Sequence, residues 1–173
     1  MQSLLDYLEP NLNLVFVGFN PGTRSAQVGH YYAGPGNLFW PLLYETGLIA
    51  TPLTYRDDVR LLEYSIGLTD LVKRSTPSSA DLSTVEARTG AAILERKLLQ
   101  YAPKVVCFNG KGVYGWYRRQ RQVGLGAQDA TIGTSRVFVA PSTSARNGRI
   151  SRSEKADTFY ALARFVSQHT GPA

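Results

Sequence analysis

A single amide stands between two glycines at the end of an apolar run, in the segment VFVGFNPG over residues 15–22. Glycine and Asn-Pro are common turn residues, so the segment alone predicts a tight turn. Glycine also lets backbone approach a ligand closely, and an amide side chain can both donate and accept hydrogen bonds. Asn20 is therefore a candidate ligand-facing residue. The segment is not a phosphate-binding P-loop, because GxxxxGK[ST] is absent and no lysine follows Gly22.

Two later segments also follow apolar runs and are rich in glycine or small residues. They are FNGKG at residues 108–112 and APSTSARNG at residues 140–148. In open parallel sheets, ligands bind beyond the carboxyl ends of the strands. We therefore expect these two segments and GFNPG to meet at one edge of a sheet.

The elements that would position these segments alternate between strand and helix. This alternation predicts a three-layer α/β/α sandwich with a mainly parallel central sheet. A capping-box pattern at Ser83 and Glu86 marks the start of one helix, and Ser151 and Glu154 could mark another. Strands are expected at 12–18, 67–71, 104–110 and 136–141, and helices at 3–9, 37–47, 57–65, 83–101, 111–120 and 151–168.

Composition limits the class of protein. The chain has 173 residues, 43% hydrophobic and 18% charged, which suits one globular domain over residues 1–173. No apolar run is long enough to span a membrane, and the acidic N-terminus lacks the basic region of a secretory signal. Cys107 is the single cysteine, which excludes an internal disulfide and a cysteine-based zinc site. We expect a cytoplasmic protein.

A net charge of +6 favours a polyanionic partner such as nucleic acid. The basic residues cluster in two places, although such clusters are equally compatible with a solvated face. The clusters are Arg118, Arg119 and Arg121, and then Arg146, Arg149, Arg152 and Lys155.

Three further stretches carry a family resemblance. Residues 29–40 read GHYYAGPGNLFW, residues 67–76 read GLTDLVKRST and residues 141–146 read PSTSAR. With GFNPG, in this order, they resemble the mismatch-specific uracil/thymine DNA glycosylases of the uracil-DNA glycosylase superfamily over roughly residues 14–165. The resemblance implies a monofunctional DNA repair enzyme that flips a base out of the duplex and hydrolyses its N-glycosidic bond, leaving an abasic site.

The resemblance implies two catalytic residues. Asn20 matches the family position that orients a nucleophilic water, which an amide can do by accepting a hydrogen bond although it cannot act as a base at neutral pH. Asp70 replaces an uncharged or basic residue of most relatives. A carboxylate there could stabilise an oxocarbenium centre or accept a proton from water. The alternative is a surface aspartate paired with Lys73 or Arg74.

Four residues are implied to bind the substrate base. Gly22 replaces the bulky aromatic residue of stricter uracil-excising relatives, so the space for a 5-methyl group is open. Tyr32 aligns with the aromatic residue that stacks on the flipped base, although the adjacent Tyr31 could take that place or both could be core. The Phe19 backbone N–H could contact the pyrimidine edge, and Ser25 lies on the loop leading to the pocket.

The segment at 141–148 resembles the family's loop that enters the duplex. Arg146 would fill the space left by the flipped base, since Ser144 is too short, and backbone of Thr143 and Ala145 would face the opposite guanine. Lys111, Arg149 and Arg152 are candidates for phosphate contacts. The predicted DNA-binding set is Lys111, Ser142, Thr143, Ser144, Ala145, Arg146 and Arg149.

No cofactor or metal is expected, and no lysine stands at an obvious nucleophile position. The expected partner is double-stranded DNA with a U·G or similar lesion, and activity on single-stranded DNA is left open. The protein is expected to be a monomer associated with the bacterial nucleoid. His30 is expected to be structural. Two alternatives stay open: a non-catalytic DNA-binding domain of the same fold, and a nucleotide-handling enzyme that uses GFNPG as a phosphate loop.

Overall fold

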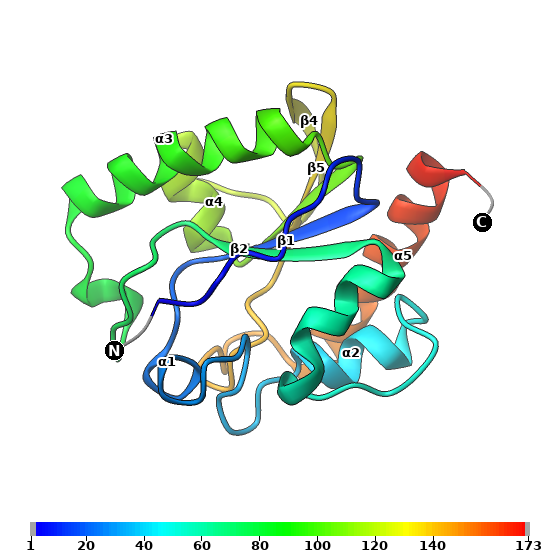
Figure 1. Cartoon of the computed structure of the whole chain (residues 1–173), viewed down its shortest axis with the longest axis horizontal. Helices are drawn as coiled ribbons and strands as arrows, with labels where there is room; N and C mark the ends of the chain where they lie inside the picture. Colours follow the sequence, from blue (N-terminus) through cyan, green and yellow to red (C-terminus); the bar gives the residue numbers. More distant parts are fainter. Residues whose placement is uncertain (1–2, 172–173) are drawn as a thin grey trace.

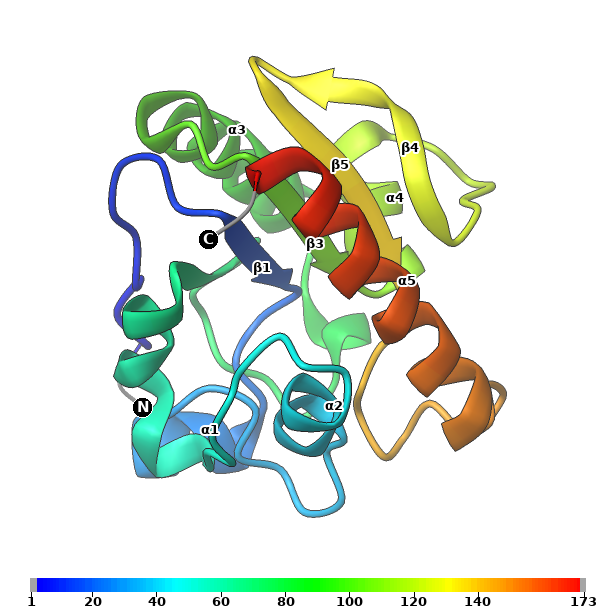
Figure 2. The same cartoon turned by 90° about the vertical axis from the view of Figure 1, so that its right-hand side faces the viewer.

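A five-stranded sheet runs through the middle of the molecule in a computed structural model that describes residues 3–171. The strand order is β2-β1-β3-β5-β4, in which β4 alone runs antiparallel, along one edge. Helices cover both faces (Figures 1 and 2), so the predicted α/β architecture is confirmed. The strands are β1 (Leu14–Gly18), β2 (Ile66–Asp70), β3 (Val105–Asn109), β4 (Gly126–Ile132) and β5 (Ser135–Ala140).

The helices form the two outer layers. α3 and α4 pack on one face of the sheet, and α2, α5 and the 3-10 helix η1 pack on the other (Figure 1). No helix among residues 3–171 is long and apolar enough to cross a membrane. The helices are α1 (Thr23–Val28), α2 (Phe39–Glu45), η1 (Tyr55–Tyr64), η2 (Ser79–Asp81), α3 (Thr84–Tyr101), α4 (Lys111–Arg118) and α5 (Arg152–Thr170).

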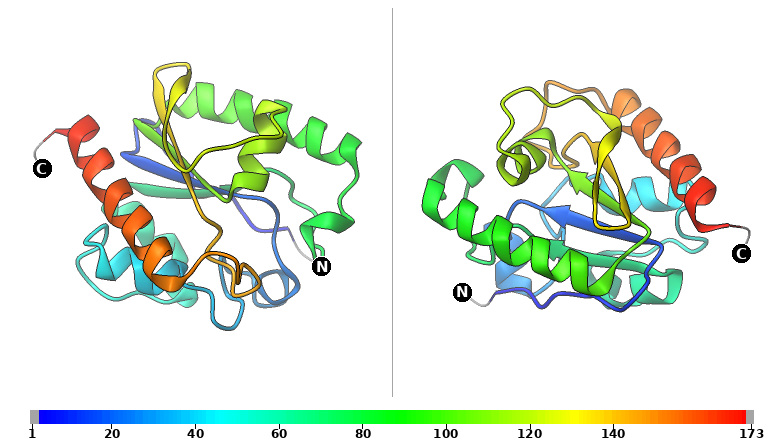
Figure 3. Two further views of the ribbon diagram at one scale, coloured as in Figure 1. Left: turned by 180° about the vertical axis from the view of Figure 1, so that it is seen from behind. Right: turned by 90° about the horizontal axis from the view of Figure 1, so that it is seen from above.

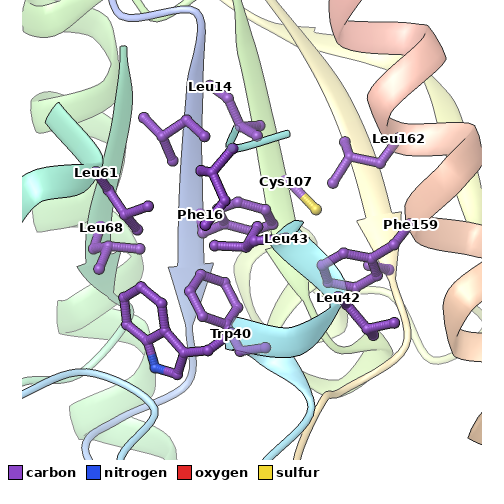
Figure 4. Close-up of a cluster of buried hydrophobic side chains, with 14 of the residues drawn as sticks. Leu14, Phe16, Trp40, Leu42, Leu43, Leu61, Leu68, Cys107, Phe159 and Leu162 are labelled. Atoms are coloured by element: carbon purple, nitrogen blue, oxygen red, sulfur yellow. The ribbon is translucent and has the colours of Figure 1, made fainter. Parts of the chain in front are cut away.

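The alternation of side chains along β1 produces two separate cores. Leu14 and Phe16 point to the face covered by α2 and α5, whereas Val15 and Val17 point to the face covered by α3 and α4. Figure 4 shows the first core, in which Phe16 lies near Leu43 and Phe159. Full burial on both faces explains why β1 is apolar throughout, as is typical of a central parallel strand.

Local capping signals set the helix starts. Ser83 accepts from the Glu86 amide and Glu86 accepts from the Ser83 amide, so the predicted capping box begins α3. Ser151 and Glu154 make the same reciprocal pair at α5. Both predictions are confirmed.

Three parts of the sequence-based prediction need correction. The helix expected at 3–9 is wrong: Tyr7 forms an antiparallel bridge to Leu68 and so covers the outer edge of β2. The short helix α1 and the antiparallel strand β4 were not predicted. The side chains of β4 alternate between partly buried and exposed positions, and the strand lacks the apolar run that identifies a central strand.

The register of the sheet fixes which residues meet at its carboxyl edge. Gly18 at the end of β1 lies opposite Asp70 at the end of β2. On the other side of β1, Asn109 at the end of β3 lies opposite Ala140 at the end of β5. The loops that follow these four strands therefore start from one edge.

Candidate active site

The loops after β1, β2 and β5, together with Asn109 at the end of β3, line a cleft of about 770 Å³. Figure 3 shows the loop that follows β5 (orange) beside the segment that contains α1 (blue), below the sheet in its left-hand view. Most of the predicted site residues line this cleft. They are Phe19, Asn20, Gly22, Ser25, Tyr32, Asp70, Ser142, Thr143, Ser144, Ala145 and Arg146.

Two predicted DNA-binding residues lie outside the cleft. Lys111 is the first residue of α4 and lines a separate hollow on that helix, together with Trp116 and Arg121. Arg149 is exposed on the loop between β5 and α5. Both remain available for contacts beyond the cleft.

Asn20 is held by its amide nitrogen. Its Nδ2 donates to the Arg74 carbonyl at 2.9 Å and to Thr76 Oγ1 at 2.7 Å. A carbonyl oxygen can only accept, so the nitrogen must face Arg74 and the orientation of the amide is determined. Asn20 Oδ1 accepts no hydrogen bond from residues 3–171 and is free to bind a water in the cleft.

Asp70 is buried and is not a surface aspartate. Its residue is 6% exposed, its Oδ2 has no hydrogen-bond partner among the described residues, and burial raises the pKa of its carboxyl from 3.8 to about 7. Neither expected partner pairs with it: Lys73 binds Asp6, and Arg74 binds Glu86. The side chain is therefore a poorly solvated carboxyl that can exchange a proton near neutral pH.

Gly18 makes room for this carboxyl. A Cβ at Gly18 would lie 2.5 Å from Asp70 Oδ1 and 3.3 Å from Tyr32 Oη. The first distance is far below any van der Waals contact, so only glycine allows Asp70 to point into the cleft from the neighbouring strand. Gly22, in contrast, has an ordinary extended conformation with φ −69°, and no atom lies within 4 Å of its missing Cβ. The space beside Gly22 is therefore open.

Tyr32 presents an aromatic ring that is fixed from behind. Its ring stacks on Phe39 with centroids 3.9 Å apart and planes inclined by 23°, and its backbone has the rare φ of +54°. Tyr31, by contrast, is 2% exposed and its hydroxyl binds the Leu5 carbonyl and Lys73. Tyr31 therefore belongs mainly to the core, which leaves Tyr32 as the candidate for the predicted stacking on a base.

Ser25 and His30 shape the loop that carries Tyr32. Ser25 is buried, and its Oγ accepts from the Ala33 amide at 3.0 Å. His30 Nδ1 lies 3.0 Å from Oδ1 of the buried Asp58, whose other carboxylate oxygen accepts from the Tyr31 amide. Both side chains are committed to holding the loop. Phe19 lines the cleft, and its carbonyl accepts from Val72.

The loop after β5 is anchored from below. Asn109 Nδ2 donates to Thr143 Oγ1, and the Thr143 amide donates back to Asn109 Oδ1. The Thr143 carbonyl accepts from the Leu38 amide. Thr143 is fully buried, and both its backbone N–H and its carbonyl are therefore bound within the protein. Lys155, 4% exposed, donates to the Ser144 carbonyl. Ala145 and Arg146 are left as the exposed tip.

Arg146 spans the mouth of the cleft. Its Nη1 donates to the Pro77 carbonyl on the loop after β2, so this side chain connects the loop after β5 to the loop after β2. An arginine that enters DNA would have to release that contact. Within residues 3–171, the exposed guanidinium is bound by the Pro77 carbonyl alone, so this contact can be exchanged for one to DNA.

The sequence analysis missed three residues that hold the cleft in place. They are Thr76, Asn109 and Lys155, the last of which supports the loop after β5 from inside. Thr76 accepts from Asn20 and donates to the Ser78 carbonyl. Asn109 could have been predicted as a cleft residue, because it stands at the end of an apolar strand, much as Asn20 stands just after one. Nothing local marks Thr76, because its partner Asn20 is distant in sequence, and nothing in the sequence around Lys155 indicates that it folds back onto the Ser144 carbonyl.

The fold and the cleft match known proteins. The structure is similar to the solution NMR structure of a Methanosarcina acetivorans protein provisionally assigned as a uracil DNA glycosylase. The TM-score is 0.67 at 22% identity, with 96% of this chain and 98% of that chain covered, which establishes a uracil-DNA-glycosylase-like α/β fold.

The family model described as the Uracil DNA glycosylase superfamily matches residues 5–164. The chain belongs to the uracil-DNA glycosylase superfamily. This membership supports a DNA glycosylase role, with DNA as the partner.

Proposed function

We propose that this protein is a monofunctional, mismatch-specific DNA glycosylase that removes uracil, and other mismatched or damaged pyrimidines, from duplex DNA by base flipping. The observation that carries the proposal is the pairing of a fixed amide with a buried carboxyl. Asn20 has its nitrogen occupied and its oxygen free, and Asp70 faces the same cleft.

The chemistry follows from these two groups. Asn20 Oδ1 accepts a hydrogen bond from a water and so orients it toward the C1′ carbon of the flipped nucleotide. As the glycosidic bond breaks, the ionised Asp70 carboxylate stabilises positive charge on the sugar and takes the proton that the attacking water releases. The bonding electrons leave with the base, which is then protonated by solvent.

The surroundings support a pyrimidine substrate. The cleft lies within the roughly 300–1,000 Å³ typical of small-molecule sites, and Tyr32 offers a ring surface for stacking. The open space at Gly22 admits a 5-methyl group, so thymine opposite guanine is expected to be a substrate beside uracil. No lysine of the described residues lines the cleft, which supports simple hydrolysis without a Schiff base.

Incubation of a labelled U·G duplex with the protein, followed by heating in alkali, tests the proposal. Strand cleavage after alkali, with no cleavage before it, is the expected result. Asn20→Ala should slow single-turnover excision by at least about tenfold, because the water loses its acceptor, whereas Gln100→Ala, an exposed amide on α3, should excise like the wild type. Tight binding of a duplex that stays intact would instead identify a non-catalytic DNA-binding domain.

A further inference from the structure

Two buried oxygens at the cleft have no hydrogen-bond partner within the described part of the chain. They are Tyr32 Oη and Asp70 Oδ2. Buried polar atoms are almost always paired, because an unpaired one loses its bonds to water without replacement. Two such atoms in one cleft therefore call for an explanation.

The Tyr32 hydroxyl and the Asp70 carboxyl are neighbours. Both approach the same point, the position of a Cβ on Gly18, to 3.3 Å for Tyr32 Oη and 2.5 Å for Asp70 Oδ1. They make no direct hydrogen bond. Because both atoms lie close to this one point, a single water can contact both. Asn109 also lies beside the Tyr32 hydroxyl, and its amide donates toward it, which lowers the pKa of the phenol against the effect of burial. Because Asn109 Oδ1 accepts from the Thr143 amide, the phenol proton is left for another acceptor.

Packing alone does not account for the hydroxyl. The stacked contact of Tyr32 with Phe39 involves the ring, which phenylalanine would supply equally well. The hydroxyl adds a polar atom to a buried place and costs free energy unless it has a partner. Burial and the nearby Asp70 charge raise the pKa of the Tyr32 phenol, so it keeps its proton and acts as a donor.

The two lysines near Asp70, Lys73 and Lys97, do not line the cleft; they line a second hollow that Asp70 also borders. Lys73 and Lys97 both bind Asp6, which also accepts from Thr69. None of these groups makes an ion pair with Asp70. On the cleft side, the Tyr32 hydroxyl is a donor that approaches the Asp70 carboxyl.

We propose that Tyr32 is a positioning residue, whose hydroxyl donates through one bound water to the Asp70 carboxylate and holds it toward the water on Asn20. This role rests on the proposed function and is distinct from stacking on a base. Tyr32 retains its proton throughout, and the proton from the attacking water goes to Asp70. Loss of the donor would leave the carboxylate less stabilised and free to turn.

The test is Tyr32→Phe, which keeps the ring and its stack. Single-turnover excision of uracil at neutral pH should fall by about tenfold, with unchanged affinity for abasic product DNA, and the rise of rate with pH should move to higher pH by about one unit. Tyr114→Phe removes the hydroxyl of another tyrosine of the core, on α4, and should leave both rate and pH profile unchanged. In an Asp70→Asn background, Tyr32→Phe should have no further effect. A wild-type rate and profile in Tyr32→Phe would overturn the proposal.

A second measurement does not depend on activity. NMR titration of the Asp70 side-chain carboxyl carbon should give a higher pKa in Tyr32→Phe than in the wild type, and no change in Tyr114→Phe. An identical titration in all three proteins would refute the contact. If the wild type leaves U·G duplex intact while the titration still shifts, the proposed function fails and the contact between Tyr32 and Asp70 stands.

Discussion

The substitution Asp70→Asn should make the protein both slower and more stable at alkaline pH. Asp70 is buried, with one oxygen unpaired, and its pKa is raised from 3.8 to about 7. The folded state thus binds this proton more tightly than the unfolded state does. The stability gained from the protonated carboxyl is complete below pH 3.8 and is lost as the pH rises through about 7.

The size of the effect follows from the shift. About three pKa units correspond to about 4 kcal/mol of lost stability, of which about 2 to 3 kcal/mol is lost between about pH 5 and about pH 8. The amide of the variant does not titrate, so any constant difference between an amide and a neutral carboxyl cancels when the two pH values are compared. The free energy of unfolding of Asp70→Asn, relative to the wild type, should therefore rise by about 2 to 3 kcal/mol between about pH 5 and about pH 8.

Urea unfolding of both proteins at the two pH values measures the stability, and single-turnover excision on U·G duplex measures the chemistry. Wild-type excision should rise with pH through about 7, because the ionised carboxylate is the active form. The variant should be at least about tenfold slower at about pH 8 and nearly independent of pH. Asp129→Asn, an exposed aspartate on β4, is the matched control. Parallel stability curves for wild type and Asp70→Asn would show that the carboxylate is solvated and refute the reasoning.

Three other substitutions test the cleft. Gly18→Ala should reduce excision as much as Asp70→Asn, because the new Cβ displaces the Asp70 carboxyl; equal activity would show that its position is unimportant. Gly22→Phe should reduce thymine excision from T·G far more than uracil excision from U·G, measured on matched duplexes, because the ring fills the space for the methyl group. Arg146→Ala should weaken binding and excision on duplex more than on single-stranded DNA, measured by fluorescence anisotropy and cleavage, since only a duplex has a gap to fill. A uniform loss on both substrates would indicate a phosphate contact instead.

The parts of the fold that depend on local signals could be predicted from the sequence. The buried run of β1 and the capping boxes at Ser83 and Ser151 are written within a few residues, and the structure has them where expected. The segment at 3–9 was misassigned, because its pairing with Leu68 lies some sixty residues away in sequence. Strand β4 sits on an edge and carries too few apolar residues to be recognised.

The sequence predicted which residues meet in the cleft better than which contacts they make there. Asn20, Tyr32 and Arg146 were identified by motif, and the structure brings them to one cleft. The state of Asp70 was not predictable. The sequence places Lys73 and Arg74 next to it as natural partners, but both are bound to acids from other parts of the chain. Which charge pairs with which is decided by tertiary structure.

That competition for lysine explains how an unpaired carboxyl survives at the end of β2. Lys73 and Lys97 both approach Asp70 closely enough to lower its pKa, and a direct ion pair with either would make it a weaker base. Asp6 binds both lysines and by its own charge raises the pKa of Asp70. The same N-terminal segment that covers the edge of β2 through Tyr7 therefore keeps the lysines away from the proposed catalytic carboxyl. The N-terminal segment thus has two effects: the backbone of Tyr7 covers the sheet edge, and the carboxylate of Asp6 raises the proton affinity of Asp70.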